Sequence, residues 1–150
     1  MIAYPDTSFL CALYVTQDNS RPALAQYQRL TEPLHVTGLL LYEFRQSVRL
    51  QTYLHRHDSR KGYPDAVADK ALAYLQANLA SGSLVMVPVD IADVLAKAER
   101  LSTQYTGTTG HRAFDVLHVA TALHFGVREF LTFDDRQRKL ATATGLKVKP

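Results

Sequence analysis

The sequence predicts an α/β domain, because short apolar segments alternate along the chain with longer stretches of helical character. Its 150 residues suit one domain, residues 1–150, and 47% apolar with 21% charged residues is ordinary globular usage. No apolar run approaches the roughly 18 residues of a membrane span, so we expect no membrane partner. Cys11 is the single cysteine and has no partner for an internal disulfide, which favours a reduced, cytoplasmic location.

Five short apolar segments are predicted to form a parallel sheet: residues 2–4, 34–36, 84–87, 130–132 and 146–148. The first of them runs into Pro5, which has no backbone N–H to donate. We therefore expect this strand either to end early or to lose one bond of its ladder.

The segments between these strands are predicted to be helices, because capping and breaking residues bound them. Asp6 and the two hydroxyl residues after it can cap the first helix, Pro22 suits a first turn, and Gly82 closes a later helix. The predicted helices are 9–15, a second from 20 onward, 39–55, 63–80, 90–105, 111–125 and 134–144. Residues 55–62 are predicted to be a polar turn, and the Thr/Gly run 106–110 a flexible loop that cannot continue a helix.

Four acidic residues do not fit an ordinary water-facing position: Asp6, Glu43, Asp115 and Asp134. Asp6 and Asp134 follow apolar strands, whereas Glu43 interrupts the apolar run 39–44. Asp115 lies in a helix that is apolar on nearly every side. A carboxylate removed from water needs a compensating cation or hydrogen-bond donor, so each of the four calls for a partner.

The predicted topology brings these four carboxylates to one edge of the sheet. Asp6 and Asp134 lie at the carboxyl ends of strands, while Glu43 and Asp115 lie in the first turns of helices that begin at that edge. Clustered carboxylates repel one another unless a positive charge lies between them. Mg²⁺ and Mn²⁺ are bound by such oxygen clusters, and one or two of these ions suit phosphodiester hydrolysis.

Each acid also has a purely structural interpretation. Asp6 and Asp134 are good helix caps. Glu43 can turn outward or pair with Arg45 or Arg112, and Arg112 is also the nearest cation for Asp115.

Four short motifs resemble the PIN-domain ribonucleases, in order and over nearly the whole chain. They are Asp6-Thr7-Ser8-Phe9-Leu10, Leu41-Tyr42-Glu43-Phe44, residues 112–123 (RAFDVLHVATAL) and Leu131-Thr132-Phe133-Asp134. Within that family, the chain is most similar to the toxin component of VapBC-type toxin–antitoxin pairs. Where the family usually has an aliphatic residue before its first acid, this sequence has Pro5.

The resemblance implies a single PIN-like domain with strand order 3-2-1-4-5 and metal-dependent cleavage of single-stranded RNA. It also implies a homodimer and an antitoxin whose C-terminal segment fills the active-site groove. Asp6, Glu43 and Asp115 match the three principal acids of the family, and Asp134 matches its more variable fourth. Ser8 and Thr132 match the hydroxyl residues beside the first and fourth acids.

Other polar residues have weaker assignments. His118 follows Asp115 by three positions and can orient a phosphate or a metal-bound water, or serve as a buried core histidine. Arg112 can clamp a scissile phosphate. The basic stretch 55–61 is either a contact for the RNA backbone or a solvated turn.

The sequence thus predicts a Mg²⁺- or Mn²⁺-dependent endoribonuclease that acts as a toxin. A net charge of +3 is compatible with a polyanionic substrate. One alternative keeps the fold and site in an RNA-processing nuclease that has no antitoxin. Another is a non-catalytic RNA- or protein-binding module, in which the acids are caps and ion pairs.

Overall fold

The computed structural model describes residues 1–150, and all of its strands run parallel. The strands are β1 (Ala3–Pro5), β2 (Leu34–Val36), β3 (Leu84–Met86), β4 (Glu129–Leu131) and β5 (Lys147–Lys149). Hydrogen-bonded ladders join β1-β4-β5 and, separately, β2-β3. Because β2 lies beside β1, the spatial order is 3-2-1-4-5, as the family resemblance implied.

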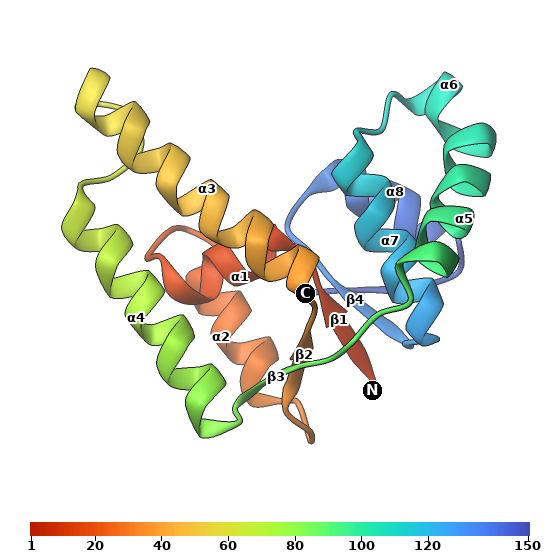
Figure 1. Ribbon diagram of the computed structural model, residues 1–150, viewed down its shortest axis with the longest axis horizontal. Coiled ribbons are helices and arrows are strands. Elements are labelled where there is room, and N and C mark those ends of the chain that lie inside the picture. The colour runs from red at the N-terminus through yellow and green to blue at the C-terminus, as the bar shows by residue number, and fades with distance from the viewer.

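Helices flank the strands on both sides (Figure 1). They are α1 (Thr7–Tyr14), α2 (Ser20–Gln28), α3 (Gly38–His57), α4 (Asp65–Ser81), α5 (Ile91–Leu101), the π-helical turn η1 (Ser102–Thr106), α6 (Gly107–Thr109), α7 (Ala113–Phe125) and α8 (Asp135–Ala143). The first four helices lie on one side of the strands, and α5 to α8 lie on the other. None of the helices combines the length and the hydropathy that a membrane-spanning segment requires.

Pro5 belongs to β1, so the strand does not end before it. Asp6 N–H donates to the Leu131 carbonyl, and the Ile2 carbonyl accepts from Glu129, so Ile2 and Asp6 both direct their backbone groups at β4. Backbone direction alternates along a strand, and Pro5 therefore turns its missing donor toward β2. That is the side on which no ladder forms.

The core lies between the strands and the helices on both sides of them. Its largest fully buried side chains include Tyr4, Phe9, Phe44 and Phe130. Phe9 belongs to α1 and Phe44 to α3, so each helix is anchored close to the carboxyl edge of the strands. This anchoring fixes where the polar residues of the same turns lie.

The predicted loop at residues 106–110 is wrong. The helix continues through η1 and α6, and Gly110, with φ of +67°, ends it in the left-handed region. Glycine weakens a helix by only about 1 kcal/mol. Here Thr108 and Thr109 hydroxyls both donate to the Tyr105 carbonyl and occupy a backbone acceptor near the helix end. The third helix is also longer than predicted and ends at His57 rather than near His55.

Candidate active site

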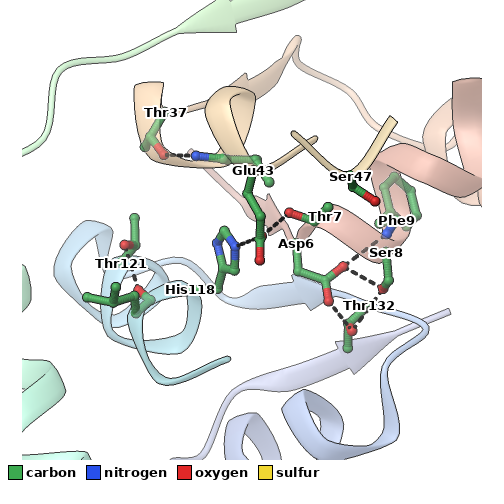
Figure 2. A network of polar contacts seen from close by, with 12 residues as sticks. Asp6, Thr7, Ser8, Phe9, Thr37, Glu43, Ser47, His118, Thr121 and Thr132 are labelled. Atoms are coloured by element: carbon green, nitrogen blue, oxygen red, sulfur yellow. Dashed lines mark hydrogen bonds and ion pairs between the residues drawn. The ribbon is translucent and has the colours of Figure 1, made fainter. Parts of the chain in front are cut away.

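The site is built where β1 and β4 end side by side. Asp6 directly follows β1, and Thr132 directly follows β4. The bond from Asp6 N–H to the Leu131 carbonyl (3.0 Å) extends their pairing by one residue, so the two side chains meet. Helices α3 and α7 bring Glu43 and His118 to the same region (Figure 2).

The carboxylate of Asp6 is fully buried, and both of its oxygens accept hydrogen bonds. Oδ1 accepts from the Ser8 hydroxyl (2.7 Å) and from Phe9 N–H (2.9 Å), the second of which caps α1. Oδ2 accepts from the Thr132 hydroxyl (2.6 Å). All three donors are neutral, and Asp6 forms no ion pair. Asp6 is therefore a cap, as the structural interpretation held, and also a buried carboxyl group that pairs with no cation.

Burial raises the pKa of Asp6 above its usual range, because an ionised carboxylate loses its hydration there. The hydrogen bonds from Thr132, Ser8 and Phe9 lower that pKa, and so does the charge of His118, but burial outweighs them. A neighbouring cation would favour the ionised form of this group.

The hydroxyl groups of Ser8 and Thr132 connect Asp6 to the start of α8. Thr132 Oγ1 accepts from Asp134 N–H (2.9 Å), and Ser8 Oγ accepts from Phe133 N–H (2.8 Å). Each hydroxyl thus donates to the acid and accepts from the backbone after β4. This arrangement fixes the orientation of the Asp6 carboxylate and the direction in which the chain leaves the strand.

Glu43 is half-buried and pairs with two groups. Its Oε2 accepts from the Thr7 hydroxyl and contacts Nε2 of His118 at 2.5 Å. Burial raises the pKa of Glu43, but the hydrogen bonds and charge of His118, together with Thr7, outweigh burial and bring the pKa below its usual range. Glu43 does not turn outward, and it pairs with neither Arg45 nor Arg112.

His118 is fully buried in α7, and its ring lies 6.2 Å from the ring of Tyr4, centroid to centroid. Its Nε2 faces Glu43, whereas its Nδ1 has no hydrogen-bond partner. The histidine is thus a core residue that also reaches the site. Figure 2 shows the His118–Glu43 contact beside the hydrogen bonds of Asp6.

Asp115 is only 8% exposed, in the first turn of α7. Its Oδ2 accepts from the backbone N–H of Arg112 (3.1 Å), and it makes no ion pair with the Arg112 guanidinium. The local ion pair that the sequence allowed is therefore absent. Asp115 is a second largely buried carboxylate without a cation.

Asp134 is the N-cap of α8 and accepts from Arg136 N–H (2.8 Å) and Gln137 N–H (3.0 Å) through Oδ1. It is partly exposed and reaches Asp6 only through Thr132. The cap interpretation of Asp134 is confirmed, and its role in a reaction stays a prediction.

The fit of these residues to a metal ion is mixed. Buried carboxylates without cations, such as Asp6 and Asp115, are suitable donors for Mg²⁺ or Mn²⁺. However, no group of three or more acidic, histidine or cysteine side chains lies close enough together to hold a metal ion. Glu43 is turned to His118 and Asp134 to its helix, which explains why the four acids do not converge as the topology alone suggested. The donor chemistry fits, with water completing the ligand set, as Mg²⁺ usually requires.

Two contacts of Glu43 were not predicted from the sequence. Thr7 donates a hydrogen bond to Glu43. Its position directly after Asp6 could have indicated this, because a residue that follows the end of a strand lies near the edge of the sheet. The pairing of His118 with Glu43 spans 75 positions, and only the packing of α7 against the strands reveals it.

These features define an α/β domain with buried carboxylates at the carboxyl edge of a parallel sheet. The family model for the PIN domain matches residues 3–143, and the chain belongs to the PIN-domain family. No curated protein matches the sequence significantly.

Solved structures share the fold at low sequence identity. VapC20 of Mycobacterium tuberculosis, a toxin that cleaves the sarcin–ricin loop, is 20% identical with a TM-score of 0.65, over 99% of each chain. FitAcB of Neisseria gonorrhoeae is 19% identical with a TM-score of 0.62, over 100% of this chain and 97% of that one. VapBC2 of Rickettsia felis, bound to a promoter DNA fragment, is 14% identical with a TM-score of 0.66, over 99% and 98%.

Proposed function

We propose that the chain is a Mg²⁺- or Mn²⁺-dependent endoribonuclease that cleaves single-stranded RNA. The observation that carries this proposal is Asp6, a fully buried carboxylate at the sheet edge with three neutral donors and no cation. Membership of the PIN family and the likeness to VapC20, an RNA-loop-cleaving toxin, support the same reaction class.

In this proposal Asp6, Glu43, Asp115 and Asp134 are the catalytic acids, and the two buried acids that pair with no cation, Asp6 and Asp115, would hold the ion together with water. A divalent cation bound there would supply an activated water and neutralise charge on the reacting phosphate. Ser8 and Thr132 orient Asp6 through their hydroxyl groups.

The neighbouring polar side chains complete the proposed site. Thr7 and His118 hold Glu43 on the side of α7, so His118 acts as a positioning residue here. Arg112 is exposed at the start of α7 and supplies a positive charge for the RNA backbone. The basic stretch 55–61 is less suited to that role, because Arg56 pairs with Asp65, and Arg60 and Lys61 pair with Asp58.

We further propose that the chain is a cytoplasmic toxin whose partners are an antitoxin protein and a second copy of itself. Support comes from the VapC, VapBC and FitA-containing structures that share its fold. A small reading frame next to its gene that encodes a DNA-binding protein, and co-purification of that protein with this chain, would support the pairing. An isolated gene whose expression does not slow growth would favour an RNA-processing nuclease instead.

The cleavage proposal is tested by incubating the purified chain with an unstructured RNA oligonucleotide in Mg²⁺, in Mn²⁺ and in EDTA. We expect cleavage with either ion and none in EDTA, and no cleavage of a DNA oligonucleotide of the same sequence. Absence of cleavage under all conditions, with a folded chain, would favour the non-catalytic binding module. Cleavage that survives EDTA would contradict the metal requirement.

A further inference from the structure

A groove of about 450 Å³ lies directly beside Glu43, between α3 and the start of α7. Figure 1 shows α3 and α7 on opposite sides of the strands. The groove is lined by Tyr42, Glu43, Gln46, Ser47, Leu50, Arg112 and Phe114. Its volume is within the range of small-ligand sites, which is roughly 300–1,000 Å³. None of the assignments above gives a role to its aromatic residues.

Two aromatic rings on this groove are exposed and have no aromatic partner. Tyr42 is 58% exposed and Phe114 is 36% exposed. The other large aromatic side chains near the site, such as Phe44 and Phe9, are buried and packed. Neither Tyr42 nor Phe114 stacks on any aromatic ring of the chain. Single exposed aromatics are common, but two on one groove next to a proposed catalytic acid indicate a ligand surface.

The polar residues of the groove suit a nucleotide. Arg112 is exposed and forms no ion pair, so its charge is available for a phosphate. Gln46 lies one helical turn after Tyr42 and is also exposed, so its amide offers both a donor and an acceptor to a base edge. An aromatic ring, an unpaired arginine and a free amide are the groups that proteins use for single-stranded RNA.

We propose that Tyr42 and Phe114 form a stacking platform for an unpaired RNA base next to the bond that is cut, with Arg112 binding an adjacent phosphate. This inference rests on the proposed RNA cleavage and specifies how the substrate is held. It explains a preference for single strands, because a base within a duplex is already stacked and its faces are not accessible to side chains. Arg112 and Gln46 match a phosphate and a base edge together, which favours RNA as the occupant of this groove.

The test measures binding separately from cleavage. A single-stranded RNA that carries 2-aminopurine is titrated with the full chain in EDTA, and both anisotropy and the quenching of 2-aminopurine by stacking are followed. Tyr42→Ala and Phe114→Ala are each expected to weaken binding about 5- to 100-fold, as the loss of one stacked base does, and to reduce the quenching. In Mn²⁺, the same variants are expected to raise KM and leave kcat nearly unchanged.

Two variants serve as controls. Tyr42→Phe keeps the ring and is expected to bind like the wild type, because stacking does not need the hydroxyl. Tyr74→Ala removes a ring of similar exposure (53%) on α4, away from the groove, and is expected to change neither binding nor KM. Both alanine changes in the groove are at exposed positions, so the thermal midpoint should stay close to that of the wild type.

The outcomes separate this inference from the proposed function. If the wild type cleaves RNA but Tyr42→Ala and Phe114→Ala bind and cleave like Tyr74→Ala, the stacking platform is wrong and the nuclease stands. If these variants keep RNA binding but change the sedimentation of the chain, the groove binds protein and the inference is overturned. If the wild type neither binds nor cleaves any RNA, both proposals fail.

Discussion

At Asp6, burial and hydrogen bonding act in opposite directions on one carboxyl group, and burial prevails. The raised pKa has a consequence for stability in the absence of metal. The contribution of Asp6 to the free energy of unfolding is fully present below the pKa that Asp6 has in the unfolded chain. It is lost as pH rises through the raised pKa that Asp6 has in the folded chain. Glu43 has a lowered pKa, so its contribution is present above the unfolded value and is lost only as pH falls through that lowered pKa.

We therefore expect Asp6→Asn to flatten the decline in stability between about pH 4, near the usual carboxyl pKa, and pH 7.5. The asparagine has no charge to desolvate, so the pH-dependent cost disappears. Urea unfolding in EDTA across this pH range, on wild type and variant, measures the effect. Parallel pH profiles for the two proteins would show that Asp6 does not titrate at a raised pKa.

A comparison of Asp134 with Asp90 separates a role in helix capping from a role in catalysis, because Asp90 caps α5 in the same way and is not a proposed catalytic acid. Each accepts two backbone N–H groups through Oδ1, Asp134 from Arg136 and Gln137, and Asp90 from Ala92 and Asp93. Asparagine is an equally good N-cap, so Asp134→Asn and Asp90→Asn should each change the free energy of unfolding by less than about 0.5 kcal/mol.

RNA cleavage should distinguish the two variants. We expect cleavage to fall about tenfold or more in Asp134→Asn and to stay at the wild-type rate in Asp90→Asn. Equal activity in both would assign Asp134 to capping alone.

The residue scale also shows how far the sequence can predict the site. Asp6 and Asp134 were found because residues that follow parallel strands must lie at one edge, whatever the details of packing. The direction of a side chain is different, since it depends on neighbours far apart in sequence. Glu43 turns to His118 because α3 and α7 begin at the same edge, and no local pattern around Glu43 contains that information.

At the scale of elements, the hairpin of α3 and α4 depends on Gly62 in the turn between them. A Cβ atom at Gly62 would lie 2.0 Å from the backbone oxygen of Gln51, and its φ is +59°. Gly82, after α4, has a similar φ of +77° but open space around its Cα. A side chain at either glycine would therefore be strained by the left-handed backbone, but only a side chain at Gly62 would also clash with a neighbouring backbone atom.

Gly82→Ala is expected to destabilise the fold by about 1–2 kcal/mol, the cost of left-handed backbone for a residue with a Cβ. Gly62→Ala should cost clearly more, because the backbone of α3 or the turn must shift. Urea midpoints of the two variants measure this difference. Equal destabilisation would mean that the turn does not press against Gln51.

Elements of the chain differ in how well their sequence predicts them. The strands and most helices were located correctly because apolar runs and caps agree with the final packing. The segment 106–109 was not, since its threonine and glycine residues favour a loop locally. In the structure the hydroxyl groups of Thr108 and Thr109 bond the Tyr105 carbonyl at the end of this helix, and propensity alone does not reveal such a contact.

At the scale of the whole molecule, the parallel order 3-2-1-4-5 places the proposed acids and the groove of Tyr42 and Phe114 on one edge. The chain carries a net charge of +3, and two of the proposed acids, Asp6 and Asp115, are largely buried and pair with no cation. The central claim is that these carboxylates bind a divalent ion and that RNA cleavage depends on it. An ion that binds the folded chain and not the unfolded chain would raise the free energy of unfolding by mass action.

Asp115→Asn tests this claim most directly, because the asparagine oxygen can still accept from Arg112 N–H while the charge is lost. The measurement pairs a thermal melt, in EDTA and in Mn²⁺ at pH 7.5, with cleavage of an unstructured RNA. The account predicts an unchanged midpoint in EDTA, a smaller gain from Mn²⁺, and cleavage reduced at least about 100-fold. Full cleavage by the variant, or an equal loss of stability with and without Mn²⁺, would contradict the account and leave Asp115 a structural residue.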